Sequence, residues 1–310
     1  MTATPNHQSN ELHELHIPVL LSEVLQYLNP QAGESYLDLT AGYGGHARKV
    51  LERTEAPEKA VLVDRDHNAI KVLTAEFANA AHRNSELLHT DFLQASQTLR
   101  QQGRRFDMIL ADLGVSSPHL NHAERGFAIS LEGPLDMRMD QTSGPTAADI
   151  VNNYSADELT DILQRYGEEP KSRHIAQLII QNRPSKLEGG YTTTTQLAQV
   201  VARAWPGHSK VHPATRTFQA LRIAVNDELR MVEQSLPLWL ELLAPGGRLV
   251  VISFHSLEDR LVKQAFVEAG GNRYDAQVQL LTKRPVVAGA DELDFNPRAR
   301  SAKLRAVVKH

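Results

Sequence analysis

Residues 37–46 read LDLTAGYGGH, and this stretch decides the fold. The apolar residues at its start predict a strand over 36–39, and the pattern that follows predicts a helix over 45–54. Three glycines stand where the strand turns into the helix. Because glycine has no Cβ, the backbone of such a turn can come close to a ligand. The stretch therefore predicts a site for a nucleotide-like cofactor at the edge of a parallel sheet.

Short apolar runs alternate with helical patterns on both sides of this turn, which is typical of βαβ units. Strands are predicted over 60–63, 87–89 and 106–110, and a helix over 68–81. An acid that holds ribose hydroxyls is expected about 20 residues after the glycines, at the end of the second strand. Asp64 occupies that place. The alternative is that Asp64 only caps the following helix.

The glycine turn alone does not decide the cofactor. Gly42, Gly44 and Ala47 also satisfy the dinucleotide pattern G-x-G-x-x-G/A, so an NAD-dependent oxidoreductase stays possible at this point. Two later segments resemble methyltransferase motifs: DLGVSSP at 112–118, which follows the fourth strand, and LAPGGR at 243–248. In amino-methyltransferases a short polar segment ending in proline follows the fourth strand and holds the target amine. The segment here is longer than the usual four residues.

The middle of the chain changes character. Residues 124–144 are rich in Gly, Pro, Met and charge and are predicted as a long loop. Helices are predicted over 156–167, 171–182 and 195–204, the first opened by a capping box at Ser155, and a helical pattern over 213–243 is predicted to break or kink near Pro237. An apolar strand is expected over 248–254. The predicted division is 1–118 and 212–310 for an α/β domain and 119–211 for a helical insertion.

Composition narrows the class of protein. The 310 residues include no cysteine, and the fourteen histidines are scattered, so neither disulfides nor a metal site is expected. No leader or membrane-length apolar run is seen, which favours a cytoplasmic protein. The net charge of −4 argues against a nonspecific coat on nucleic acid but not against a nucleic-acid enzyme. The basic C-terminus is either a solvated tail or an RNA contact: Arg298, Arg300, Lys303, Arg305 and Lys309.

Eight segments together resemble the bacterial ribosomal RNA small-subunit methyltransferase H family, also called MraW, and they span most of the chain. They are HIPVL at 16–20, GGH at 44–46, DRD at 64–66, DLGVSSP at 112–118, ERGF at 124–127, GPLDMRMD at 133–140, HPATRTFQALR at 212–222 and SFHSLEDR at 253–260.

The resemblance implies a Rossmann-like α/β class I methyltransferase, dependent on S-adenosylmethionine, with an inserted helical domain. Its implied reaction is methylation of the N4 amine of a cytosine in the decoding region of 16S rRNA, within the small ribosomal subunit. The implied cofactor contacts are Gly44, Gly45, His46, Asp64, Phe92, Asp112 and His119, the last at a position where relatives often have glutamine. Without the resemblance, Phe92 is more typical of a core aromatic, and His46 could have a plain surface role.

Further residues receive predicted roles near the substrate. Asp112, Ser116, Ser117 and Pro118 are the catalytic candidates, and Arg138, His255 and Arg260 are the candidates for RNA binding. Residues 253–259 do not predict a hydrolytic triad, because neighbours along a strand point to opposite faces. Residues 137–139 are either packing or a lid over the target base. A DNA amino-methyltransferase and a noncatalytic assembly factor stay open beside the NAD enzyme.

Overall fold

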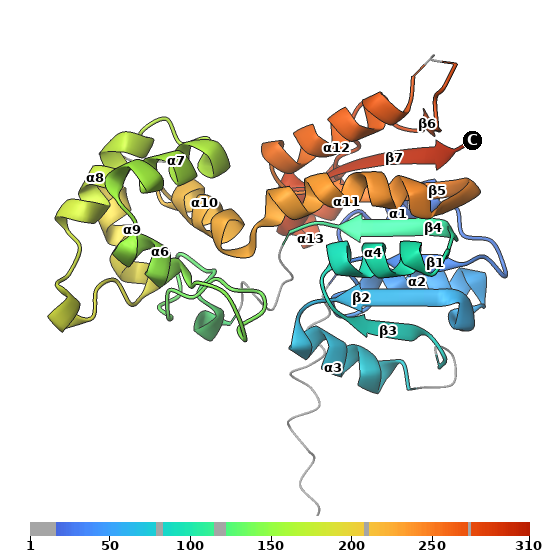
Figure 1. Ribbon diagram of the computed structural model, residues 1–310, viewed down its shortest axis with the longest axis horizontal. Helices are drawn as coiled ribbons and strands as arrows, with labels where there is room; N and C mark the ends of the chain where they lie inside the picture. Colours follow the sequence, from blue (N-terminus) through green and yellow to red (C-terminus); the bar gives the residue numbers. More distant parts are fainter. Residues whose placement is uncertain (1–16, 79–82, 115–121, 208–210, 272–273) are drawn as a thin grey trace, which may run out of the picture. The chain divides into compact units, whose positions relative to one another are not determined.

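The structure is a computed structural model that describes residues 17–78, 83–114, 122–207, 211–271 and 274–310 (Figure 1). The chain forms two compact units, the first made of Met1–Gly114 and Val232–His310 and the second of Val115–Met231. The second boundary differs from the predicted one at 211/212. Helix α10 (Thr215–Asn226) belongs to the second unit because Phe218 and Leu221 are buried in that unit's apolar core.

The first unit is built on one seven-stranded sheet in the order β3-β2-β1-β4-β5-β7-β6 (Figure 1). The strands are β1 (Tyr36–Asp38), β2 (Ala60–Asp64), β3 (Glu86–His89), β4 (Phe106–Asp112), β5 (Leu243–Ser253), β6 (Val278–Leu280) and β7 (Lys303–Lys309). The first five pair in parallel, whereas β7 runs antiparallel to both β5 and β6. A reversed β7 between β5 and β6 is the strand order of class I methyltransferases. The predicted α/β fold class is confirmed.

Apolar side chains cover both faces of this sheet. One core joins the strands to α1 (Leu21–Leu28), α2 (Gly45–Thr54) and α3 (His67–Glu76). The other joins them to α4 (Phe92–Gln101), α11 (Glu228–Leu242) and α12 (Ser256–Ala269). Trp239 is fully buried in the second of these cores and donates its indole N–H to Ser96 Oγ at 3.1 Å. The three layers leave the carboxyl ends of the parallel strands as the place for a ligand.

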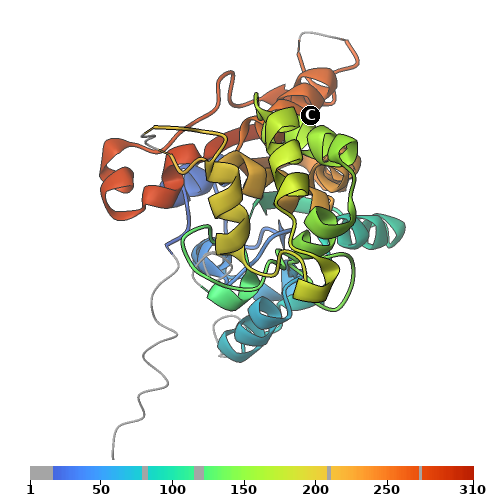
Figure 2. The same ribbon diagram turned by 90° about the vertical axis from the view of Figure 1, so that its left-hand side faces the viewer.

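The second unit is helical in its described residues, and its helices are seen in Figure 2. They are α6 (Ala147–Asn153), α7 (Ala156–Gly167), α8 (Ser172–Gln181), α9 (Thr194–Ala202) and α10. The capping box predicted at Ser155 is present: its hydroxyl accepts the Glu158 N–H, and the Glu158 carboxylate accepts the Ser155 N–H. The unit buries a core of its own, with Phe127, Leu163 and Ile175 among its members.

Several elements differ from the sequence prediction. The helical pattern over 213–243 breaks at Asp227, which ends α10 with a left-handed φ of 51°, and Pro237 lies inside α11. The helix α1 and the strands β6 and β7 were not predicted. The remaining short elements are α13 (Ala290–Phe295) and the 3-10 helices η3 (Pro57–Lys59), η4 (Ala123–Arg125), η5 (Lys186–Glu188) and η6 (Pro297–Ser301).

The basic C-terminus is not a solvated tail, because it contains β7, an interior strand of the sheet. Arg305 is buried and forms two hydrogen bonds with the Asp259 carboxylate on α12. The Lys309 ammonium donates to the Leu240 carbonyl near the end of α11 and to the Leu243 carbonyl at the start of β5. These cations therefore hold α11 and α12 to the sheet. In the part of the chain that the structure describes, none of the helices combines the length and the apolar character that a membrane crossing requires.

Candidate functional site

Three aspartates end three adjacent parallel strands of the first unit: Asp38 on β1, Asp64 on β2 and Asp112 on β4. Because β1 pairs with both β2 and β4, the three carboxylates lie along one edge of the sheet. This is the edge at which open α/β sheets bind their ligands. The sequence predicted roles for Asp64 and Asp112 but none for Asp38.

The Asp64 carboxylate organises the glycine turn. Its Oδ2 accepts the Gly42 N–H at 2.7 Å, and its Oδ1 accepts the Asp66 N–H at 2.8 Å. The N-cap of α3 is Asp66, whose side chain accepts the Asn68 N–H, so the alternative that Asp64 is the helix cap is wrong. Each carboxylate oxygen can accept more than one hydrogen bond. The half-buried Asp64 therefore keeps capacity for ribose hydroxyls at the position predicted.

The glycines of the turn are required partly by packing inside the protein. Gly44 has a left-handed φ of 79°, and a Cβ at this position would lie 2.9 Å from the Phe77 ring. A Cβ on Gly45 would meet Pro18 at 3.3 Å. Close approach to a ligand is thus not the only reason for glycine here. The role of Gly44 and Gly45 as cofactor contacts stays a prediction.

Asp112 is fixed at its backbone and has a carboxylate oxygen without a hydrogen-bond partner. Its N–H donates to Thr40 Oγ1 at 2.6 Å, which ties the end of β4 to the loop after β1. Its Oδ2 lies 3.7 Å from His46 Nδ1, and its Oδ1 is buried with no hydrogen-bond partner among the described residues. Burial and the nearby carboxylates of Asp38 and Glu258 raise the pKa of Asp112 well above its ordinary value. A buried acceptor in this state favours a ligand that brings a donor or a positive charge.

His46 is buried, not at the surface. Only 6% of the residue is exposed, and its Nε2 lies 3.0 Å from the Val19 carbonyl oxygen. Because a carbonyl can only accept, this contact places a proton on Nε2, and Nδ1 lies on the side of Asp112. His46 thus connects the segment before α1 with the end of β4. The sequence could not show this contact, since Val19 and His46 are 27 residues apart.

Asp38 is the functional candidate that sequence reasoning missed. Its Oδ2 accepts the Tyr36 hydroxyl at 2.8 Å and its Oδ1 accepts the Thr40 N–H at 3.1 Å, and only 1% of the residue is exposed. Burial raises the pKa of Asp38 to about 7, and the Asp64 carboxylate adds to this effect. Asp38 is therefore half protonated near neutral pH. The signal that the sequence offered was the place of this acid near the end of the first predicted strand, two residues before Thr40.

The raised pKa of Asp38 predicts a pH-dependent stability. Between pH 4 and 7 the folded protein holds a proton on Asp38 that the unfolded chain has lost, so the free energy of unfolding falls as the pH rises through this range and levels off above it. A single proton accounts for a slope of at most about 1.4 kcal/mol per pH unit. We expect the slope to be shallower in Asp38→Asn, as measured by urea unfolding at pH 5, 6, 7 and 8.

The matched control is Asp107→Asn, on β4. The pKa of Asp107 is held below its ordinary value because the hydrogen bonds from Ser35 outweigh its burial, so this variant should keep the wild-type slope above pH 5. An Asp38→Asn variant with an unchanged slope would show that Asp38 does not titrate in this range.

Phe92 begins α4 and packs against the protein on one side. Its ring meets the Trp239 ring edge-on, with the centroids 5.6 Å apart, and it lies against the sheet core that includes Trp239. The residue is half-buried, so part of its surface remains available. The core alternative accounts for the Trp239 contact. A contact with the cofactor on the remaining surface stays a prediction.

The structure describes only some of the remaining predicted site residues. Ser116, Ser117, Pro118 and His119 lie outside the described residues. His255 is the N-cap of α12, where its Nδ1 accepts the Glu258 N–H at 3.4 Å, and Arg260 is exposed on the same helix. RNA contacts by His255 and Arg260 stay predictions.

Arg138 lies in the second unit and is held by its own loop. Its guanidinium donates to both Asp136 oxygens, at 2.8 and 2.9 Å, and these bonds outweigh burial and keep the pKa of Asp136 below its ordinary value. The neighbouring Met137 and Met139 are buried in the unit's core. Their burial in this core supports the packing alternative for residues 137–139 over a lid above the target base.

Comparison with known proteins identifies the family of the chain. The model of the MraW methylase family matches residues 13–310. A protein of Cyanothece sp., named ribosomal RNA small subunit methyltransferase H, is 49% identical over 94% of this chain and 93% of its own length. A protein of the same name from Nitratidesulfovibrio vulgaris is 46% identical over the whole of both chains.

Among solved structures, an rRNA methylase from Streptococcus thermophilus has 12% identity and a TM-score of 0.40 and covers 100% of this chain and 98% of its own. That likeness is too distant to bear on the site, whereas the family match extends over almost the whole sequence, including all the residues discussed above. The chain belongs to the MraW methylase family.

Proposed function

We propose that this methyltransferase transfers the methyl group of S-adenosylmethionine to the N4 amine of a cytosine in the decoding region of 16S rRNA, within the small ribosomal subunit in the cytoplasm. Membership of a methylase family and the names of the relatives support the reaction and the RNA substrate. The observation that carries the proposal is the end of β4, where Asp112 Oδ1 is buried without a hydrogen-bond partner among the described residues.

The residues present fit the cofactor. An ammonium group near Asp112 would satisfy its unpaired Oδ1 and favour the ionised carboxylate, which offsets the effect of burial and of Asp38. Asp64 stands 22 residues after Gly42 with its carboxylate already oriented by two backbone N–H groups, so it is prepared to accept ribose hydroxyls. Gly44 and Gly45 open the helix α2 beside it.

The proposed reaction consists of one methyl transfer and the loss of one proton. S-adenosylmethionine, when bound, supplies an electrophilic methyl group. The nitrogen lone pair of the cytosine amine forms the new C–N bond as the C–S bond breaks, and the amine then loses one proton. Because that lone pair is delocalised into the ring, in-line positioning in a site that excludes water supplies much of the acceleration. The Asp112 carboxylate and the segment 112–118 are the proposed groups that hold the amine.

Asp112 and His46 are placed to accept the proton that the amine must lose. The His46 ring donates from Nε2 to the Val19 carbonyl, and its Nδ1 lies 3.7 Å from Asp112 Oδ2. A carboxylate next to such a nitrogen can accept a hydrogen bond from the amine and share the proton. No metal ion and no covalent nucleophile are required for this reaction. The target base must leave its stack, at a cost of a few kcal/mol that is least for an unpaired base.

The deciding experiment is transfer of labelled methyl from S-adenosylmethionine to small subunits that lack the modification, followed by mass spectrometry of the nucleosides. We expect one labelled N4-methylated cytidine per subunit. Label transferred to duplex DNA in its place would identify a DNA amino-methyltransferase. Cofactor binding without turnover would identify a noncatalytic assembly factor. Membership of a methylase family already argues against the NAD-dependent oxidoreductase.

A further inference from the structure

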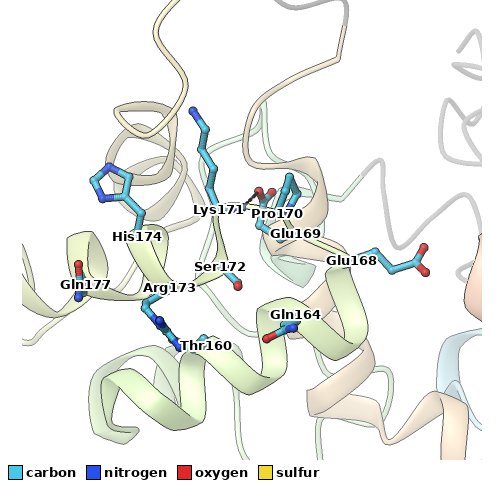
Figure 3. Close-up of a pocket in the computed structure, with 10 residues that line it drawn as sticks. All are labelled: Thr160, Gln164, Glu168, Glu169, Pro170, Lys171, Ser172, Arg173, His174 and Gln177. Carbon is cyan, nitrogen blue, oxygen red and sulfur yellow. Dashed lines mark hydrogen bonds between the residues drawn. The ribbon is translucent and has the colours of Figure 1, made fainter.

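The second unit contains a hollow of about 740 Å³ that lies between α7 and α8 (Figure 3). It is formed by the end of α7, the turn after it and the first two turns of α8. The residues that line it are mostly polar: Thr160, Gln164, Glu168, Glu169, Pro170, Lys171, Ser172, Arg173, His174 and Gln177. A volume of this size is within the range of ligand sites. None of these residues was given a role by the sequence.

The N-terminus of α8 presents donors to this hollow. Ser172 is only 7% exposed, and Figure 3 shows its hydroxyl oxygen directed toward α7. In the part of the chain that the structure describes, this hydroxyl has no hydrogen-bond partner, and neither have the backbone N–H groups of Arg173 and His174. Helix α8 has ten residues and no side-chain cap. Its N–H groups and dipole therefore favour an anion at this end.

The charges around the hollow limit the kind of anion. Lys171 also lines the hollow, but its ammonium is engaged elsewhere: it donates to the Ala204 carbonyl at 2.8 Å and lies 4.0 Å from the centre of the Trp205 ring. Arg173 is exposed, and Figure 3 shows its guanidinium extending toward Thr160 on α7. No carboxylate pairs with Lys171 or Arg173 among the described residues.

Two acids also line the hollow. The Glu169 carboxylate is buried and accepts the Lys171 N–H at 2.9 Å, and Glu168 extends away from Ser172 and Arg173 in Figure 3. These acids would repel a free phosphate with two negative charges more strongly than a phosphodiester with one. The combination of a hydroxyl, a guanidinium and free backbone N–H groups is typical of contacts to a nucleic-acid backbone.

We propose that this hollow binds a backbone phosphodiester of the substrate RNA, with Ser172, Arg173 and the first N–H groups of α8 as its donors. The inference rests on the proposed function, because it takes small-subunit rRNA as the substrate. The contact positions the RNA on the second unit and carries no base specificity. It assigns a docking role to residues that lie outside the cofactor site of the first unit.

The test measures binding of unmethylated small subunits without cofactor, for the full-length protein and its variants, from 50 to 200 mM KCl. Arg173→Ala should weaken binding about tenfold at 0.1 M salt, because it removes a charged hydrogen bond. It should also lower the slope of log K against log salt by about 1, the expected effect of one lost phosphate contact. Ser172→Ala should weaken binding severalfold with little change of slope. The affinity for S-adenosylmethionine should be unchanged in both variants.

Arg165→Ala is the matched control. Arg165 is an exposed arginine on α7 that pairs with Asp161 at 3.1 Å and does not line the hollow, so its loss should leave binding and slope as in the wild type. Arg173 is at the surface, so its substitution should not disturb folding, and a thermal melt checks the buried Ser172 variant.

Two results would overturn the inference. Equal affinity and equal slope for Arg173→Ala and the wild type would show that Arg173 does not contact a phosphate. Weaker binding of Arg173→Ala with an unchanged slope would place a ribosomal protein against the hollow instead of a phosphate. Both leave the proposed function intact as long as the wild type methylates small subunits. Failure of the wild type to methylate them would instead count against the proposed function.

Discussion

The Asp112→Asn variant is expected to bind S-adenosylmethionine roughly 10- to 150-fold more weakly than the wild type, which corresponds to loss of about 1.5 to 3 kcal/mol from a hydrogen bond to a charged group. Asparagine keeps the shape of the side chain and the backbone bond to Thr40, but it cannot carry the negative charge that a cofactor ammonium would pair with. Calorimetry measures the affinity, and single-turnover methylation at several cofactor concentrations measures the rate.

The two roles proposed for Asp112 separate in the same experiment. If it mainly holds the cofactor, saturating S-adenosylmethionine should restore most of the rate, whereas a carboxylate that accepts the cytosine amine in the transition state leaves a rate defect at saturation. We expect a mixed result weighted toward cofactor binding. The control is Asp107→Asn at the opposite end of β4, which should change neither quantity. Wild-type affinity and rate in Asp112→Asn would remove Asp112 from the site.

The pKa of Asp112 adds a pH signature to this prediction. In the protein without cofactor, burial and the carboxylates of Asp38 and Glu258 favour the protonated form, so binding of a cationic group requires loss of a proton. The affinity for S-adenosylmethionine should therefore rise with pH in the wild type, over a range above that in which an ordinary aspartate titrates. The dependence should be weaker in Asp112→Asn, because the amide does not titrate.

The βα units of the first half could be predicted because their signals are local. The helix expected over 45–54 is observed as Gly45–Thr54, and the strand expected over 60–63 as Ala60–Asp64. Their apolar periodicity and the glycine turn lie within short windows. The strand β7 escaped prediction because its arginine and lysine residues suggested a solvated segment, while its alternation of apolar residues becomes meaningful only when β5 lies beside it.

The candidate site was predictable only where a motif has a fixed spacing. Asp64 and Asp112 follow strands at recognisable distances, so the sequence placed both. The contacts that prepare them are long-range: Thr40 Oγ1 accepts the Asp112 N–H from 72 residues away, and Asp38 lies buried on β1, which pairs with both β2 and β4. The spacing of residues along the chain does not reveal contacts between residues that are far apart in the sequence. The helix break at Asp227 was not predicted because Pro237 was the stronger local signal for a break.

The Asp64→Ala variant should lose both the ribose acceptor and the order of the glycine turn. In the structure its carboxylate accepts the N–H groups of Gly42 and Asp66, so alanine leaves two backbone donors without a partner as well as removing the charged acceptor. We expect the affinity for S-adenosylmethionine to fall by at least about 1.5 to 3 kcal/mol, or 10- to 150-fold. Asp64→Asn should fall between the wild type and alanine, since one amide oxygen can still accept.

Asp66→Ala separates cofactor binding from stability in the same turn. Asp66 caps α3 through the Asn68 N–H, so its loss should cost about 1 kcal/mol of stability while the affinity for S-adenosylmethionine changes little. Calorimetry and urea unfolding on the three variants give both quantities. If Asp66→Ala weakened cofactor binding as much as Asp64→Ala, the effect would come from general loosening of the turn. If Asp64→Ala bound the cofactor like the wild type, with the fold intact by circular dichroism, Asp64 would be a structural residue of the turn and the ribose contact would lie elsewhere.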